Sequence, residues 1–457
     1  MFHHQRTFLF LQGPPSPFFQ QLGQRLLDDG HRVVKLHFQA GDALFWHHSP
    51  ARFFRLPLGM LESTLTALWR EHHVTDQVLF RDDRRWHAIA APLARRYGIR
   101  NHVFDEGYVS PDWITLEREG SHQRSLLPRD AGWYADAERR LPTSLPPRPA
   151  PHSHVRHRLL GALERCAAVF NPLFNLPTRN VDMAPPACTG RHSGGDTPDI
   201  RESAAPTFEH SLAPGMAHSL PRERTSSLLG RGDRKRRRQP QRLGAPYFLL
   251  SLAPARQPDR DGAKDATLRQ TRRRLLSLDE LERIVASFAH HAPSGYRLLL
   301  VDVHRSPCRS ATPLHATTRY LMRLARRLGI EGRLGVIGPP TLPVVSAAAG
   351  WVTPHMTQAL TALSAGCPAF TRASLPCALP GLAASQHLDR FWHAPPSPDA
   401  RLVATHRRVL IHATQINGDL YSPQGRDLAV INAAPRLSDT HSPLETLLRH
   451  SDARVAY

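Results

Sequence analysis

The feature that most constrains this chain is a repeated order of apolar runs and amphipathic segments in its first hundred residues. Residues 8–11 and 32–36 read as strands, and the segment between them carries apolar residues at helical spacing and stops at Gly30. The order recurs with strands at 77–80 and 101–104 around a helix at 84–97. Strands joined through helices pair in parallel, so this part predicts an α/β domain.

A second α/β half begins near Pro246. We expect strands at 246–251, 297–303, 334–337 and 369–370, and helices at 278–290, 318–328 and 356–365. Ser277, followed three residues later by Glu280, predicts a capping box at the start of the first of these helices. Two Rossmann-like domains that face a cleft are the simplest α/β architecture for this pattern.

Composition divides the chain into four parts. Residues 1–140 form the first domain, and 141–245 hold one helix (157–170) and a basic, proline-rich insert that we expect to be disordered. Residues 246–395 form the second domain, and 396–457 form a helical segment that crosses back to the first.

The chain is strongly basic, with a formal charge of +20 from 59 Lys plus Arg against 39 Asp plus Glu. This charge favours anionic partners such as nucleic acid, an acidic lipid surface or a phosphorylated substrate. No basic stretch is interleaved with aromatic residues, which argues against a platform that stacks bases. The densest basic run, 231–240, is either a solvated loop or a patch for a polyanion such as an acidic membrane surface.

Cysteine usage and hydropathy indicate a cytosolic protein. The five cysteines form no C-x-x-C pair and have no metal-ligand spacing, as expected of reduced thiols. The apolar run near the N-terminus is too short for a signal-peptide core, and no stretch of about 18 apolar residues could span a membrane.

Two adjacent acids, Asp105 and Glu106, precede Gly107 at the carboxyl end of the strand expected at 101–104. A glycine there allows a sharp turn, and α/β folds place their sites at the carboxyl ends of strands. The two acids are therefore the first candidates for chemistry. The ordinary alternative is that one caps the next element and the other is solvated.

A longer series of residues resembles one family. The series in the first half is Leu11-Gln-Gly-Pro14, Phe18-Phe19, Gly30-His-Arg-Val33, Phe38, Gly41, Asp42, Asp82, Arg84, His87, Gly98-Ile99, residues 104–119 and Leu127-Pro-Arg129. In the second half it is Ser287-Phe-Ala289, Ala292-Pro293, Phe391-Trp392, Pro395-Pro396 and residues 414–422. Taken in order, these strings resemble the KpsS/LipB-type capsule polysaccharide biosynthesis proteins.

The resemblance implies a GT-B-like retaining transferase that moves Kdo from CMP-Kdo to a phosphatidylglycerol-type acceptor. It further implies a peripheral location at the inner face of the cytoplasmic membrane, with other capsule-assembly transferases and an ABC exporter as partners. Neither a metal nor a cofactor other than the donor is implied. Glu106 then becomes the carboxylate that attacks or stabilises the reacting sugar carbon, with Asp105 second.

The resemblance also suggests substrate-binding residues: Gln12, Gly13, Asp82, Arg84, His87, His304, Thr357, Gln415 and Asn417. Arg84 and His87 would hold an anionic group, or else lie on a solvated helix face. His304 would contact the CMP phosphate and Thr357 would donate at a helix start, unless they are a loop residue and a cap. Gln415 and Asn417 would bind substrate or fix the chain where it crosses back.

The chain departs from the family pattern mainly in the donor region. It has Val303-His-Arg-Ser-Pro307 in place of Lys-His-His-Pro, and residues 355–359 in place of an Asn-Ser-Thr-x-Gly turn. Ser110 replaces an arginine after the acids. These departures motivate a second hypothesis: a catalytically impaired relative that serves as a membrane-associated scaffold for capsule assembly. A nucleic-acid-binding protein is a third hypothesis, which rests on charge alone.

Overall fold

The computed structural model describes residues 5–109, 113–142, 160, 245–252, 276–302 and 314–455. The helix expected at 157–170, the basic run 231–240, Ser110 and His304 lie outside these described residues. The described chain forms two separate α/β sheets, one of seven strands and one of five.

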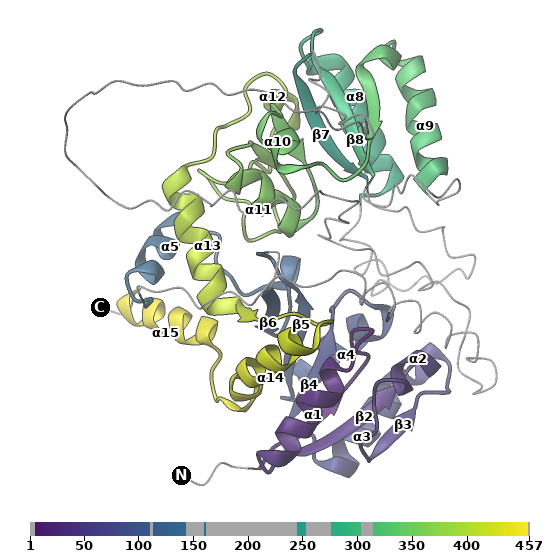
Figure 1. The fold of residues 1–457 in the computed structure, drawn as a ribbon, viewed down its shortest axis with the longest axis vertical. Helices are drawn as coiled ribbons and strands as arrows, with labels where there is room; N and C mark the ends of the chain where they lie inside the picture. The colour runs from purple at the N-terminus through teal and green to yellow at the C-terminus, as the bar shows by residue number, and fades with distance from the viewer. Residues whose placement is uncertain are drawn as a thin grey trace, which may run out of the picture. The chain divides into compact units, whose positions relative to one another are not determined.

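The first sheet has the strand order β12-β6-β5-β4-β1-β2-β3 (Figure 1). Strands β5, β4, β1, β2 and β3 pair in parallel, whereas β6 runs antiparallel to both β5 and β12. The strands are β1 Thr7–Phe10, β2 Arg32–His37, β3 Ala51–Phe53, β4 Asp76–Phe80, β5 Arg100–Glu106, β6 Trp113–Arg118 and β12 Gln415–Asn417. The last of these comes from the far end of the chain.

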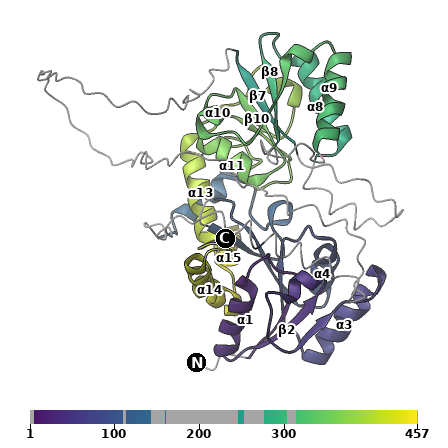
Figure 2. The same ribbon diagram turned by 45° about the vertical axis from the view of Figure 1, so that its right-hand side comes forward.

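Helices cover both faces of the first sheet. Apolar residues of α1 (Phe18–Asp28) and α14 (Pro423–Ser438) share one core with β1, β4, β5 and β6, and the two helices lie side by side (Figures 1 and 2). A second core lies between the sheet and α3 (Leu61–His72) and α4 (Arg85–Arg96). The remaining helices of this part are α2 Ala40–Ala43, α5 Ala131–Glu138, α13 Ala400–Thr414 and α15 Pro443–Val455.

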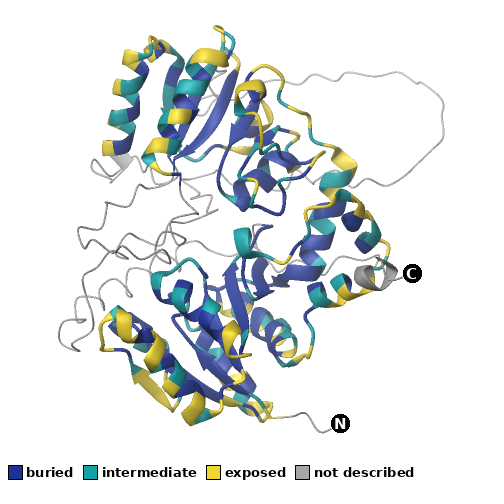
Figure 3. Ribbon diagram, turned by 180° about the vertical axis from the view of Figure 1, so that it is seen from behind, coloured by how far each residue is buried: buried dark blue, intermediate teal, exposed yellow. Residues whose placement is uncertain are grey.

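The second sheet has the order β11-β10-β7-β8-β9, and all its strands are parallel. Its strands are β7 Tyr247–Leu252, β8 Arg297–Asp302, β9 Leu334–Ile337, β10 Gly350–Val352 and β11 Ala369–Phe370. Its helices are α8 Leu278–His291, α9 Leu314–Arg327, α10 Leu342–Ser346, α11 Met356–Ser364 and α12 Leu388–Phe391. Apolar side chains of α8, α9 and α12 form its main core, and the central strands β7, β8 and β10 are almost entirely buried (Figure 3).

The predicted α/β class with Rossmann-like parallel sheets is confirmed. The capping box is confirmed as well, since Ser277 accepts from the Glu280 amide at 3.2 Å and Glu280 accepts from the Ser277 amide at 2.7 Å. A cleft between the two domains stays a prediction. Among the described helices, none has both the length and the apolar character that a membrane crossing requires.

One expectation about the acids was wrong. We placed them in a loop after a strand ending at Phe104, but β5 continues through Glu106, which pairs with Ile114 of β6. The strand is extended because the chain turns back as a hairpin, so Asp105 and Glu106 gain an antiparallel partner strand. The acids therefore have the rigid backbone of a sheet.

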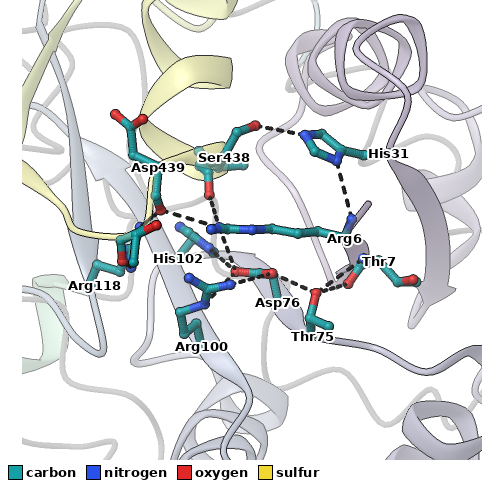
Figure 4. A network of polar contacts seen from close by, with 12 residues as sticks. Arg6, Thr7, His31, Thr75, Asp76, Arg100, His102, Arg118, Ser438 and Asp439 are labelled. Atoms are coloured by element: carbon teal, nitrogen blue, oxygen red, sulfur yellow. Dashed lines mark hydrogen bonds and ion pairs between the residues drawn. The ribbon is translucent and has the colours of Figure 1, made fainter. Parts of the chain in front are cut away.

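The amino-terminal ends of the strands hold a polar network around Asp76 (Figure 4). Its buried carboxylate lies 2.8 Å from Nε2 of His102 and 3.1 Å from Nε of Arg100. Arg6, 3.9 Å from the same carboxylate, also donates to the carbonyl oxygens of Leu437 in the last turn of α14 and of Asp439 just after it. The network thus ties the start of the sheet to the end of α14.

Candidate active site

The β5–β6 hairpin places the two acids at the end of β5, and Gly107 makes the hairpin possible. A Cβ atom at Gly107 would collide with the backbone carbonyl of Trp113 on the facing strand. Because backbone cannot move aside as a flexible side chain can, only glycine fits here without a shift. This close approach explains a glycine directly after the acids.

Asp105 is buried and held by three donors. Its Oδ1 accepts from the backbone N–H of Glu106 at 2.8 Å, and its Oδ2 lies 3.2 Å from Nε2 of His122 and 3.4 Å from Oγ of Ser121. Only 1% of Asp105 is exposed. Such contacts fix the carboxylate and leave it little access to a substrate.

Asp82 shares the Ser121 hydroxyl with Asp105. The Ser121 Oγ lies 3.4 Å from Oδ1 of Asp82, and the Ser121 N–H donates to Oδ2 at 3.3 Å. Arg124 adds an ion pair to Asp82 at 3.2 Å and donates to its backbone carbonyl at 2.9 Å. A single serine and the turn around it therefore bring two buried carboxylates together.

Glu117 of β6 adds a third buried carboxyl group to the cluster. It forms hydrogen bonds with the hydroxyls of Tyr108 and Ser125. Burial raises the pKa of Glu117 to about 8, and the charges of Asp82 and Asp105 act in the same direction, although the two hydroxyls oppose it. Glu117 is therefore mainly protonated at neutral pH and adds no full charge beside the other acids.

Glu106 is the half-buried member of this group, whereas Asp82, Asp105 and Glu117 are all buried. A carboxylate that is both accessible and fixed on a strand can act as a nucleophile or stabilise a developing positive charge. Within the described residues, no three His, Cys, Asp or Glu side chains converge as a metal site would require.

The loop after β1 lies beside the start of α4. Gln12 is buried, and its backbone carbonyl accepts a hydrogen bond from the Phe80 N–H at 3.3 Å. The carbonyl of Gly13 accepts from Nη1 of Arg84 at 3.1 Å, and the guanidinium of Arg84 lies 5.3 Å from the ring centre of Phe80. Gln12, Gly13 and Arg84 are therefore close together at the carboxyl edge of the sheet, as their assignment to one site requires.

His87 is not placed as an anion-binding residue beside Arg84 would be. It is fully buried on α4, and its Nδ1 lies 2.7 Å from the Arg81 carbonyl oxygen. Burial lowers the pKa of His87 to about 3, and the positive charge of Arg84 contributes. The ring is neutral at neutral pH, so a role in holding an anion falls to Arg84 alone.

Gln415 is buried in β12 with both ends of its amide occupied. Its Oε1 accepts from the Tyr108 N–H at 3.0 Å, and its Nε2 donates to Oγ1 of Thr115 at 3.1 Å and of Thr414 at 2.9 Å. These contacts match the alternative in which Gln415 fixes the returning chain. Asn417 ends the same strand, paired with Trp113, and is also buried.

In the second half, Thr357 lies in the first turn of α11 and is buried, and its carbonyl accepts from Oγ1 of Thr361 at 2.8 Å. The neighbouring Gln358 accepts from the hydroxyls of Ser251 and Thr353, both at 2.6 Å. His304 lies outside the described residues, so its assignment to the donor site stays a prediction.

Sequence reasoning missed five members of the cluster: Tyr108, Glu117, Ser121, His122 and Arg124. A signal existed for two of them, because Tyr108 and Glu117 lie inside the family-like string 104–119. Ser121, His122 and Arg124 follow that string and reach the acids only because the chain turns after β6.

The fold and the acid cluster define an α/β protein whose candidate chemistry lies at the edge of its first sheet. Residues 75–180 and 276–421 match the model of the capsule polysaccharide biosynthesis protein family. The chain belongs to this family.

The chain is also similar to individual proteins over most of its length. The chain is 26% identical to capsule polysaccharide modification protein LipB of Neisseria meningitidis serogroup B over 419 residues, which cover 91% of this chain and 92% of that protein. It is also 26% identical to capsule polysaccharide export protein KpsS of Escherichia coli over 421 residues, 91% of this chain and 97% of that protein. Anabaena HepE in complex with UDP aligns at 11% identity, covering 99% of this chain and 100% of that one, with a TM-score of only 0.30.

Proposed function

We propose that the protein is a glycosyltransferase of capsule assembly that moves Kdo from CMP-Kdo to a phosphatidylglycerol-type lipid. The observation that carries the proposal is the half-buried Glu106 on β5, backed by Asp105, whose carboxylate is fixed by Ser121 and His122. Membership of a capsule polysaccharide family supports the substrate class.

In this proposal the transfer retains configuration through two displacements. The Glu106 carboxylate attacks the anomeric carbon of Kdo as CMP leaves with the electron pair of the broken bond, and the acceptor hydroxyl then displaces the Glu106 carboxylate from the opposite side and releases its proton to water. Asp105 does not attack. It accepts from the Glu106 N–H and so orients the backbone that presents the nucleophile.

The partners of this reaction would be the sugar nucleotide and an anionic phospholipid surface. The basic character of the chain, with its net charge of +20, favours such a surface. Proximity to other capsule-assembly transferases and to an ABC exporter at the inner face of the cytoplasmic membrane belongs to the same proposal. CMP-Kdo would be a substrate, and the proposed chemistry needs no metal.

The test is transfer of Kdo from CMP-Kdo to a lyso-phosphatidylglycerol analogue. We expect Glu106→Gln to abolish turnover while leaving the unfolding temperature unchanged, because Glu106 is not part of the buried core. The exposed Glu71→Gln is the matched control and should transfer at the parent rate. Undiminished activity of Glu106→Gln would remove the assigned role.

A scaffold without catalysis is the second candidate. It is favoured by α11, where Gln358 already accepts two hydroxyls and Thr357 is buried, so that few side chains in this turn remain for a nucleotide phosphate. Each lost charge-assisted contact removes about 1.5–3 kcal/mol of donor affinity. Titration with CMP decides between the candidates: absence of binding would support the scaffold.

A further inference from the structure

A narrow pocket opens between the loop after β1 and the segment after β2. It is lined by Gly13, Pro14, Ser16, Phe19, Lys35, Gly41, Asp42, Phe45 and Trp46, and it has room for little more than one water-sized group. It belongs to the carboxyl half of the first sheet, since Gly13 follows β1 and Lys35 lies in β2. The pocket is too small for a sugar or a base.

Lys35 is the unusual component of this pocket. It is only 2% exposed, and its Nζ donates to the Leu11 carbonyl at 2.5 Å and lies 5.4 Å from the ring centre of Trp46. Within the described part of the chain, the ammonium group of Lys35 has one hydrogen-bond acceptor, the carbonyl oxygen of Leu11. An ammonium carries three N–H donors, so two remain for a group inside the pocket.

The residue type is itself informative. Lys35, Lys235 and Lys264 are the only lysines among the 59 basic Lys and Arg residues of the chain. Almost all basic residues of the chain are therefore arginines, yet a lysine occupies a buried position, where desolvation of a positive charge costs the most free energy. A compact ammonium fits a water-sized pocket, whereas a planar guanidinium would fill it.

Two charged side chains besides Lys35 act on the pocket. Asp42 lines it, but its Oδ2 already accepts from the Phe38 N–H at 2.8 Å and the Gln39 N–H at 3.2 Å. Arg84 reaches the same loop through the Gly13 carbonyl, and its charge acts on Lys35. The Asp42 carboxylate is therefore already stabilised by backbone donors, and Arg84 adds a second positive charge near Lys35.

We propose that the Lys35 pocket is a subsite that binds one oxygen of an anionic substrate group, a phosphodiester or a carboxylate. A bound oxyanion would accept the remaining Nζ–H donors and restore the solvation that burial removes. Assigning that group to the acceptor phosphate or to the sugar carboxylate rests on the proposed function. The inference that the pocket binds an anion does not rest on the proposed function.

Burial gives an independent readout of occupancy. It lowers the pKa of Lys35 to about 8, a shift that the Arg84 charge reinforces and Asp42 opposes. An anion in the pocket favours the charged amine and so raises this pKa. With three lysines in the chain, lysine labelled with 13C at Cε yields three resonances at most, and Lys35→Met assigns the one that matters.

The experiment titrates the full-length labelled protein with glycerophosphoglycerol, acetate or inorganic phosphate, without CMP-Kdo. We expect a saturable shift of the Lys35 resonance and a rise in its pKa with the phosphodiester if the group is the acceptor phosphate, or with acetate if it is the sugar carboxylate. Loss of one charge-assisted contact in Lys35→Met should weaken that binding about 10-fold to 100-fold. Response to inorganic phosphate alone, or to no anion, overturns the proposal.

Two further measurements keep the result interpretable. Thermal unfolding of Lys35→Met shows whether the variant folds, and if it does not, the resonance shift in the parent protein still decides. The same titration on Glu106→Gln separates this inference from the proposed function. If Glu106→Gln is inactive and its Lys35 resonance still shifts with the anion, both the anion subsite and the proposed function are supported. If the resonance shifts but turnover is undiminished, the anion subsite is supported and Glu106 is not the nucleophile.

Discussion

The Oε1 atom of Gln415 accepts a hydrogen bond from the backbone N–H of Tyr108 at 3.0 Å, although the two residues are 307 positions apart. Tyr108 lies two residues beyond the end of β5 at Glu106, and its hydroxyl lies 2.6 Å from the His122 amide nitrogen. A side chain from the end of the protein thus fixes the backbone that directly follows the two acids.

This relationship predicts a defect in the site that exceeds the defect in stability. Gln415→Ala removes the acceptor of the Tyr108 amide and loosens the turn after Glu106, so we expect turnover to fall at least 10-fold. Unfolding should be easier by about 1–3 kcal/mol, the usual cost of a buried group left unpaired. Gln24→Ala, which removes an exposed contact to Asp28, is the control. Equal activity of the two variants would contradict the role.

Gly107 allows a sharper test of the hairpin. In Gly107→Ala the new methyl group meets the Trp113 carbonyl, and we expect a loss of about 1–3 kcal/mol of unfolding free energy together with lost activity. Gly59→Ala is matched, because a Cβ there has no heavy atom within 4 Å. Denaturant unfolding of both variants measures the difference, and similar midpoints would show that the hairpin can relax.

Asp76 should be a major determinant of stability. Asp76→Ala leaves His102, Arg100 and Arg6 without their shared carboxylate, and removal of one partner from a buried charged network costs about 3–5 kcal/mol. Glu71→Ala, which breaks an exposed ion pair with Arg52, should change stability little. Comparable midpoints for the two variants would exclude the Asp76 network as an anchor of α14.

Buried histidines should make the protein sensitive to acid. Burial lowers the pKa of His87 and of His406 to about 3, so both remain neutral in the folded state. The unfolded chain takes up these protons below a pKa of about 6.5, so each histidine reduces stability by about 1.4 kcal/mol per pH unit as the pH falls from there. Above a pH of about 6.5 the histidines are neutral in both the folded and the unfolded chain, so this loss of stability is absent.

The difference in unfolding free energy between His87→Gln and the parent isolates the effect of one such histidine. This comparison is needed because Glu117 has the opposite effect: its raised pKa makes its contribution to stability largest at low pH, and this contribution is lost as the pH rises through about 8. We expect the stability of His87→Gln to fall less steeply than that of the parent between pH 6.5 and pH 5. Parallel curves from denaturant titrations would show that His87 is protonated in the folded state.

The sequence predicted the parts of the fold whose periodicity is strong. Helices such as α8, with its capping box, and the buried parallel strands have apolar patterns that reflect one environment along their length. Strand β6 was not predicted, although its Trp113-Ile-Thr-Leu-Glu-Arg118 sequence has aromatic and β-branched residues, because no continuous apolar run marks it. All six residues are buried, since β12 pairs with residues 113–115 and α14 shares a core with Ile114 and Leu116.

From local patterns alone, the candidate site was predictable only where its residues are close in sequence, whereas Asp82 and Gln415 were candidates only through the family resemblance. Asp105 and Glu106 stand together after an apolar run, so their place at a strand end could be inferred. His122 and Arg124 reach the acids through a turn, and Gln415 through a strand from the other end of the chain. Such contacts depend on tertiary structure, which no local pattern encodes.

The antiparallel addition of β12 to the first sheet also bears on the order in which the protein can fold during synthesis. Residues 7–118 leave the ribosome early, but the outer edge of β6 and the apolar surface that α14 covers stay open until residues 415–438 have been translated. During that interval an unpaired strand edge is exposed to other chains, which is a recognised route to aggregation. Nascent chains that stall before residue 415 should therefore depend on chaperones.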